Sequence, residues 1–382
     1  MIKTLTACTR EIDDAAVAIA EIKKTLDIEK NLLKNSLGII SCFTEFDESG
    51  VLKAICDALP FECIGTTSSL CAAGPEIDQI ILVITVLTSD DCNFKTTAIP
   101  VDDGYKESIN QRLSGFLNET QEKPVFFLSY FPLINAISGD MMLSAIDSVT
   151  GGIPLFGTAA IDHTMDYSMS KTIHNGQMFR EAIVLGAVYG KPNFMFEIAS
   201  IDESRIRSQK AIITKSNGNV LISVNEKTAI DYFEGIGVTK DELSIGLGII
   251  PLVVDLKDGT KPVARAVFAL TDEGYAVCGG IMPEGAALTI ARIDKNDVLQ
   301  TTENTLKPLV TNDGVILSYS CLARFLALGA TNKAEAEKVR DVVGKLKYHY
   351  ACSGGEICPL ADAHGKFKNI YHNYTNVICK LW

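Results

Sequence analysis

The chain has 382 residues, 47% of them hydrophobic and 21% charged, and its 35 Lys and Arg against 47 Asp and Glu give a net charge of −12. A chain of this length can bury several complete cores without needing disulfides or a metal. The acidic balance repels phosphate backbones and no Lys/Arg run is interleaved with aromatic residues, so the sequence argues against a nucleic-acid partner.

Eleven cysteines lie along the chain, many of them inside apolar runs such as those around Cys42, Cys278, Cys321 and Cys379. Free cysteine behaves as a small buried hydrophobe, so we expect reduced core thiols and a cytoplasmic location. The longest apolar runs fall far short of the ~20 residues that a membrane-spanning helix needs, so we expect no membrane partner.

The first half of the chain predicts two similar units, each made of a strand, a helix, a strand that ends in a small-residue turn, and a further strand. In the first unit these elements cover residues 37–43, 50–59, 63–69 and 80–87. In the second unit they cover residues 125–130, 135–148, 153–160 and 182–189.

The region from about residue 201 to residue 305 is different, because it is rich in short strands and hairpin turns such as Asn217-Gly218. It predicts an antiparallel sheet with one helix at residues 227–233. The repeated unit then returns, with strand 314–320, helix 333–345, turn 350–356 and closing strand 369–381. We therefore predict an α/β (α+β) fold with mixed sheets and two layered domains, residues 1–200 and 201–382.

The three small-residue turns are the first candidate for a binding site. Glycine lets the backbone approach a ligand closely, and Ser or Thr hydroxyls can bond to it. The alternative is that such turns only connect elements. Their recurrence favours a shared pocket, with these ligand-binding residues: Gly65, Thr66, Thr67, Gly157, Thr158, Ser353, Gly354 and Gly355.

Two charged residues complete the predicted site. Glu356 follows the last turn, where its carboxylate could bind a ligand ammonium, act as a base if burial raised its pKa, or cap a turn or helix. Arg324 could bind a ligand carboxylate, although a structural pair with a carboxylate, Glu356 included, is slightly favoured. Arg265, in a strand between alanines, could face solvent or the cleft between domains, and solvent is favoured.

The sequence offers little sign of catalytic chemistry. Cys352 lies near His349, and a reactive thiol would need a base or helix N-terminus to lower its pKa. The chain has no Cys-x-x-Cys, no metal-type histidine pairing and no phosphate-binding glycine loop, so we expect no metal and no cofactor.

Ordered blocks along nearly the whole chain resemble the FIST family. Residues 61–67 (FECIGTT) and 153–162 (IPLFGTAAID) resemble segments of FIST N-terminal domains. Pro251-Leu252 and residues 320–324 (SCLAR), 353–357 (SGGEI) and 372–375 (HNYT) resemble the C-terminal domain. One departure is that residues 65–74 lack the Glu that follows the first turn in the family, which puts any ligand contact by that Glu in doubt.

The resemblance implies a stand-alone sensory protein that binds a small ligand, such as an amino acid or a related metabolite, and signals to a partner protein. The alternative is a hydrolase or transferase that uses Cys352 or a carboxylate in an inter-domain pocket.

Overall fold

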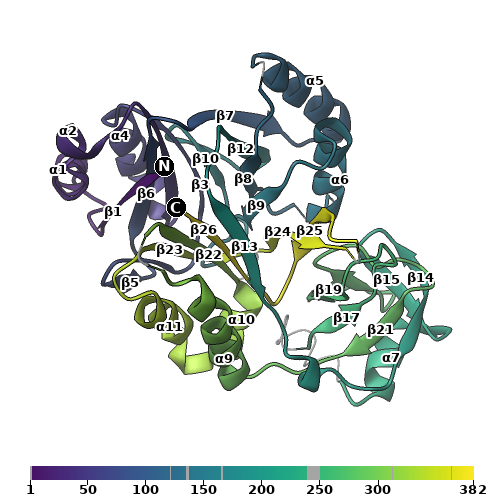
Figure 1. The fold of residues 1–382 in the computed structure, drawn as a ribbon. Helices are drawn as coiled ribbons and strands as arrows, with labels where there is room; N and C mark the ends of the chain where they lie inside the picture. The colour runs from purple at the N-terminus through teal and green to yellow at the C-terminus, as the bar shows by residue number, and fades with distance from the viewer. Residues whose placement is uncertain are drawn as a thin grey trace.

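A computed structural model describes residues 2–120, 122–134, 137–164, 167–238, 250–311, 313–362 and 364–382. Three six-stranded mixed sheets form one part of the molecule, which we call the three-sheet body. A fourth, antiparallel sheet lies beside it, at the lower right of Figure 1. The predicted α/β class with mixed sheets is confirmed.

Each sheet of the body is built around the same three strands. The first two run parallel to each other, and the third pairs antiparallel with the first. The sets are β2 (Asn35–Cys42), β3 (Glu62–Thr67) and β6 (Leu82–Ser89); β8 (Phe126–Phe131), β9 (Leu155–Ala159) and β12 (Ala182–Tyr189); β22 (Val315–Cys321), β23 (Lys347–Ser353) and β26 (Asn376–Leu381). The threefold recurrence in the sequence is therefore a threefold recurrence of sheets.

A hairpin that follows the second strand of each set joins a different sheet. The hairpin β4 (Cys71–Ala73)–β5 (Glu76–Asp78) pairs with β23, β10 (Thr172–His174)–β11 (Gln177–Phe179) pairs with β3, and β24 (Glu356–Ala361)–β25 (Phe367–His372) pairs with β9. Edge strands β1 (Lys3–Thr9), β7 (Asn93–Pro100) and β13 (Phe194–Ala199) lie on β6, β12 and β26. Because of these exchanges, no unit completes its own sheet.

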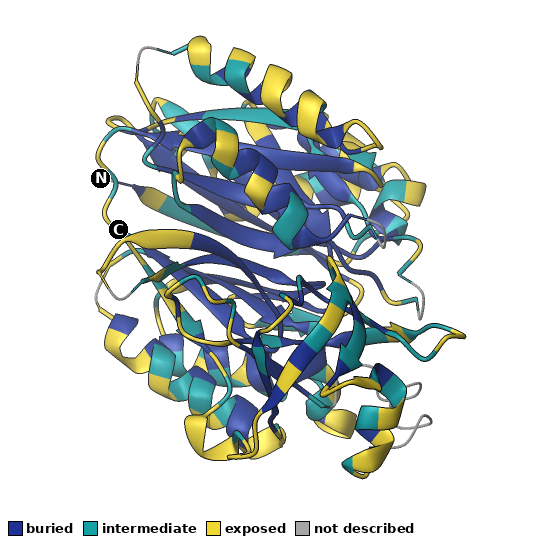
Figure 2. Cartoon of the chain, turned by 90° about the vertical axis from the view of Figure 1, so that its right-hand side faces the viewer, coloured by how far each residue is buried: buried dark blue, intermediate teal, exposed yellow. Residues whose placement is uncertain are grey.

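Three groups of helices cover the outside of the body (Figure 1). They are α1 (Ala15–Leu26), α2 (Ile28–Asn31), α3 (Glu45–Glu48) and α4 (Val51–Asp57); α5 (Tyr105–Asn118) and α6 (Gly139–Thr150); and α9 (Lys295–Leu306), α10 (Leu322–Ala327) and α11 (Ala334–Val343). Short 3-10 turns cover Glu203–Arg205, Lys307–Leu309 and Gly329–Thr331. Figure 2 shows buried strands in the interior and exposed residues mainly on helices and loops. Residues 135 and 136 of the helix predicted at 135–148 lie outside the described residues.

The central core lies between the three sheets. Side chains from all of them meet there, among them Leu37, Phe126, Leu128, Leu317 and Cys379. All eleven cysteines are free thiols and ten of them are buried, as predicted. No helix in the described ranges is long and apolar enough to cross a membrane.

The fourth sheet, residues 206–291 as far as they are described, is called the small domain here. Its strands are β14 (Ala211–Asn217), β15 (Val220–Val224), β16 (Lys227–Thr228), β17 (Leu252–Val254), β18 (Val263–Arg265), β19 (Val267–Leu270), β20 (Ala276–Cys278) and β21 (Ala287–Ile290), with helix α7 (Ala229–Gly235). Its strand pairs are antiparallel, as predicted. Strands β22–β26, which follow it, return to sheets of the body. The boundary predicted at residue 200 stays a prediction.

Candidate functional site

The structure brings the three small-residue turns together where the second strand of each set ends. The Ile161 amide donates to the Thr67 carbonyl, and the Gly354 amide donates to the Ala159 carbonyl over 3.0 Å. The Cys352 amide donates to the Leu70 carbonyl, also over 3.0 Å. The turns therefore hold one another through backbone hydrogen bonds.

The predicted residues of these turns are buried. Thr66, Thr67, Thr158 and Ser353 have no exposed surface, and the Thr158 hydroxyl donates to Ser353 Oγ over 2.7 Å. Gly65 and Gly157 are explained by the neighbouring strand, because a Cβ at either position would overlap the carbonyl of Ile40 or Ser129. Close backbone approach is thus required, and its partner is the parallel strand beside each glycine.

Glu356 begins β24 and is fully buried behind the third turn. Its Oε2 accepts hydrogen bonds from the Thr375 hydroxyl at 2.8 Å and the Thr375 amide at 3.3 Å. Its Oε1 has no hydrogen-bond partner of normal geometry. Burial raises the pKa of Glu356 from 4.5 to about 8, although the hydroxyls of Thr375 and Ser353 oppose the shift. At neutral pH the group is mainly a neutral acid.

Arg324 forms a structural pair with a carboxylate, the role that the sequence slightly favoured. Its partner is Glu335 rather than Glu356. Its Nε and Nη2 donate to Glu335 Oε1 over 3.0 and 2.8 Å, and both side chains are fully buried. Its Nη2 also donates to the Thr302 hydroxyl and the Val298 carbonyl, and its Nη1 donates to the Ala199 and Tyr374 carbonyls over 3.5 Å. Glu335 is fixed from its second oxygen by the Ser320 hydroxyl. The donors of Arg324 are therefore already engaged inside the protein.

The favoured expectation that Arg265 faces solvent is wrong, and the residue lies at the junction with the small domain instead. Its side chain is fully buried, where Nη2 lies 3.2 Å from both carboxylate oxygens of Asp140. Its Nη1 donates to the Tyr371 carbonyl over 2.6 Å. Asp140 Oδ2 also accepts the Ile281 amide at 2.8 Å. Arg265 in β18 thus connects the small domain to the first turn of α6 and to β25 in the body.

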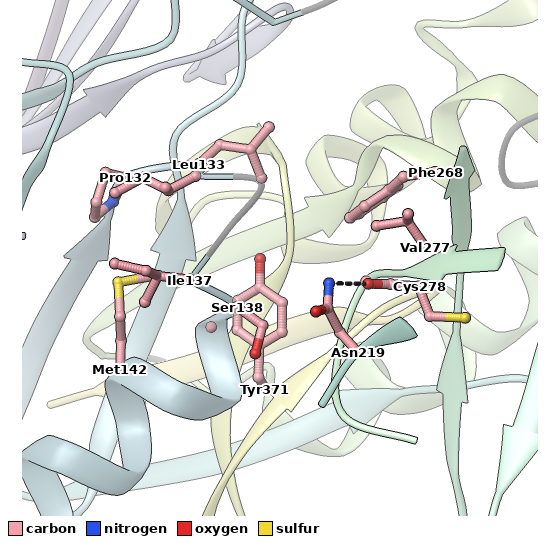
Figure 3. Close-up of a pocket in the computed structure, with 13 residues that line it drawn as sticks. Pro132, Leu133, Ile137, Ser138, Met142, Asn219, Phe268, Val277, Cys278 and Tyr371 are labelled. Carbon is pink, nitrogen blue, oxygen red and sulfur yellow. Dashed lines mark hydrogen bonds between the residues drawn. The ribbon is translucent and has the colours of Figure 1, made fainter. Parts of the chain in front are cut away.

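A hollow lies at this same junction and was missed by the sequence reasoning (Figure 3). It is small, with a cavity volume of about 20 Å³, which is room for about one water molecule. Its lining comes from three separate stretches, which are Pro132, Leu133, Ile134, Ile137, Ser138, Gly139 and Met142; Asn219, Phe268, Val277, Cys278 and Gly279; and Tyr371. The body and the small domain therefore each supply part of its wall.

Tyr371 connects the hollow to the third turn. A Cβ at Gly139 would overlap its ring, and a Cβ at Gly355 would overlap its hydroxyl. The hydroxyl donates to the Gly354 carbonyl over 3.3 Å. The glycines of the third turn are thus needed to seat Tyr371, whose ring forms part of the hollow wall.

Polar groups gather at the centre of the hollow. Ser138 is the N-cap of α6, yet its side chain makes no capping hydrogen bond, and its Oγ is buried without a partner. Asn219 lies nearby and donates from Nδ2 to the Cys278 carbonyl over 3.0 Å. Figure 3 shows Ser138 and Asn219 beside the Tyr371 ring, with Ile137 and Met142 on one side and Phe268 and Val277 on the other. A serine before Gly139-Asp140 is a helix-start signal that could have drawn attention to this position.

The contacts of Cys352 do not favour its use as a nucleophile. Burial raises the pKa of its thiol well above the usual value, so it stays protonated. His349 is three residues away in β23 and bonds to Ser41 and Thr85, while burial lowers its pKa to about 3. Residues three apart on a strand point to opposite faces, so the two do not form a dyad. Within the described ranges no cluster of His, Cys, Asp or Glu could hold a metal ion.

Comparison with known proteins places the chain. The FIST N domain model matches residues 36–227 and the FIST C domain model matches residues 231–359. FIST domains are known as small-ligand-binding sensory domains in signal transduction. A search of curated proteins finds no match. Among solved structures, cyanuric acid hydrolase is 8% identical over 99% of this chain and 98% of that chain, with a TM-score of 0.36, too weak to carry an argument.

The two family matches follow each other along the chain and together cover most of its length. The resemblance inferred from residues 61–67, 153–162 and 353–357 is therefore confirmed. The chain belongs to the FIST family and carries a FIST N domain followed by a FIST C domain.

Proposed function

We propose that this protein is a cytoplasmic sensor that binds a small polar metabolite, of the amino acid class or related to it, and signals to a partner protein. The observation that carries the proposal is the hollow between the three-sheet body and the small domain, which would widen to admit a ligand if the small domain moves on the body. Ligand sites are commonly concave, mostly apolar, placed between domains and supplied with a few polar groups. Membership of a family of small-ligand-binding sensory domains supports the same function.

In this proposal the predicted turn residues position the site from behind. Gly354 accepts a hydrogen bond from the Tyr371 hydroxyl in the wall of the hollow, Gly355 leaves room for that hydroxyl, and Ser353 Oγ accepts the Gly355 amide. The first two turns hold the third in place. The Leu70 carbonyl accepts the Cys352 amide, the Ala159 carbonyl accepts the Gly354 amide, and the Thr158 hydroxyl donates to Ser353 Oγ. Arg324 supports the body through Glu335.

The signal would arise from a change in how the small domain sits on the body. A ligand in the hollow touches both parts, and it stabilises whichever arrangement it binds more tightly. The Arg265–Asp140 pair spans the same junction, beside the start of α6. A partner protein would then recognise the ligand-bound arrangement.

A thermal-shift screen of amino acids and small carboxylic acids tests the proposal. A ligand that binds only the folded state at a hundred times its Kd raises stability by about 2.7 kcal/mol, so its melting temperature rises. Val277→Trp fills the hollow and should abolish the shift. Ile212→Trp, at an exposed position of β14 outside the hollow, should keep it. Absence of any stabilising compound, or equal shifts in Val277→Trp, would count against a ligand in the hollow.

A further inference from the structure

The small domain, at the lower right of Figure 1, has a hydrophobic core of its own. All described members of that core lie within residues 211–290, and none comes from the three-sheet body. Toward the body, β18 packs against β25, and a small apolar cluster of Ala266, Cys321, Ala323 and Tyr374 crosses the junction. Two domains move relative to each other unless their interface is large and hydrophobic.

Both connections between the small domain and the body pass through one place. The Arg292 amide donates to the Arg205 carbonyl over 3.2 Å, and Ile206 forms an antiparallel β-bridge with Ala291. The Arg205 Nε donates to Asp297 Oδ1 over 2.7 Å, which ties this crossing to the first turn of α9. The entering and leaving segments therefore form a single narrow connection, about which a domain can rotate.

A second set of contacts holds the small domain to other elements of the body, namely α6 and the turn between β25 and β26. Asp140 of α6 pairs with the fully buried Arg265, and it also accepts the Ile281 amide at 2.8 Å. In the turn, Asn373 Oδ1 accepts the Ala266 amide at 3.1 Å. Two body side chains thus receive donors from the small domain.

Gly279 and Gly280 of the small domain lie directly against these contacts. A Cβ at Gly280 would overlap Asp140 and the Arg265 guanidinium, and a Cβ at Gly279 would overlap the Asn373 side chain. Neither glycine has a positive φ, so close approach rather than backbone shape explains both. Separating a buried charge from its partner is costly, so the ion pair is satisfied only while the small domain keeps this position.

From these contacts we infer that the small domain is a lid. It swings on a hinge, the paired segments at Arg205 and Arg292, and is held shut by a latch, the contacts of Asp140 and Asn373. Opening separates the walls of the hollow, because the body and the small domain each supply part of them. What the opening admits rests on the proposed function, whereas the motion itself is measured without a ligand.

Hydrogen–deuterium exchange mass spectrometry on the full chain tests the lid. Asp140→Asn weakens one half of the latch, and its readout is the Ala266 amide, which bonds to Asn373 instead. Asn373→Ala removes the other half, and its readout is the Ile281 amide, which bonds to Asp140. If the latch opens as a unit, each substitution should speed exchange of the amide that it does not contact by about tenfold or more. Exchange within β14 and β15 of the small domain should stay as in the wild type.

Asp147→Asn is the matched control, because Asp147 lies on the same helix but bonds to Asn369 within the body. It should leave the exchange of both amides unchanged. Unchanged exchange at both amides in the latch variants would show that these contacts do not hold a lid. An equal rise within β14 and β15 would show that the small domain unfolds rather than swings, which also overturns the inference.

The lid and the proposed ligand can fail separately. If the exchange shows a lid and no compound stabilises the protein, the proposed function fails and the lid remains. If the exchange shows no lid, a compound that stabilises the wild type but not Val277→Trp would still place a ligand in the hollow.

Discussion

Replacing Glu356 with glutamine tests the buried acid behind the third turn. The substitution keeps the shape of the side chain and an oxygen for the Thr375 hydroxyl and amide. It removes the titratable proton, and the new amide nitrogen faces the side that has no partner in the wild type. We expect the variant to be more stable than the wild type at neutral pH.

The magnitude follows from the pKa shift. The folded pKa is about 8 and the ordinary value is 4.5, so the unfolded chain releases this proton at a lower pH than the folded chain. Folding therefore becomes less favourable as pH rises from about 4.5 to 8. With 1.36 kcal/mol per pKa unit, the free energy of unfolding of the wild type falls below its value at low pH. The decrease is about 1 kcal/mol at pH 5, about 3 kcal/mol at pH 7 and about 4 kcal/mol at pH 8. The glutamine variant does not have this loss.

Urea unfolding of both proteins at pH 5, 6, 7 and 8 measures the effect. The free energy of unfolding of the variant, minus that of the wild type, should rise by about 3 kcal/mol across this range. Glu337→Gln, at an exposed position of α11, is the control and should show no such rise. A difference that stays constant with pH would refute the buried neutral acid.

Three further substitutions or reactions follow from the contacts. Arg324→Met leaves Glu335 buried without its cation and should destabilise the protein by about 3–5 kcal/mol in urea unfolding, with recovery in the double variant Arg324→Met/Glu335→Leu. If the single variant is as stable as the wild type, the pair has no structural role. Gly157→Ala places a methyl group on the Ser129 carbonyl and should abolish cooperative thermal unfolding, whereas Ala145→Gly in α6 should cost only about 1 kcal/mol. A well-folded Gly157→Ala protein would contradict the close strand approach. Iodoacetamide at pH 7 should leave Cys352 unmodified in the native protein while Cys8, the one partly exposed cysteine, reacts slowly, as peptide mass spectrometry can check. Rapid labelling of Cys352 would revive the enzymatic alternative.

The sequence predicted those parts of the fold that depend on local pattern. The strand–helix–strand units and the antiparallel region follow from hydrophobic periodicity and turn residues, and both are present. The exchange of hairpins between sheets could not be predicted in this way. Cys71 pairs with Ala351, 280 positions away, and no local pattern distinguishes that partner from a strand nearer in the sequence.

The candidate site was predicted less well, for related reasons. The glycines of the turns were correctly taken as sites of close approach, but sequence alone does not say whether a ligand or a neighbouring strand makes that approach. Arg324 and Arg265 look alike as single cations in apolar segments, and both found carboxylates, Glu335 and Asp140, on other elements. The hollow joins three distant stretches, so its existence depends on tertiary structure.

The measurement that tests the central claim most directly is mass spectrometry of small molecules released from the purified protein. Wild type and Val277→Trp would be expressed and purified side by side, denatured, and their extracts compared. We predict a small carboxylic acid in near-stoichiometric amount in the wild-type extract that is missing from the Val277→Trp extract. Identical extracts from the two proteins would contradict a ligand in the hollow.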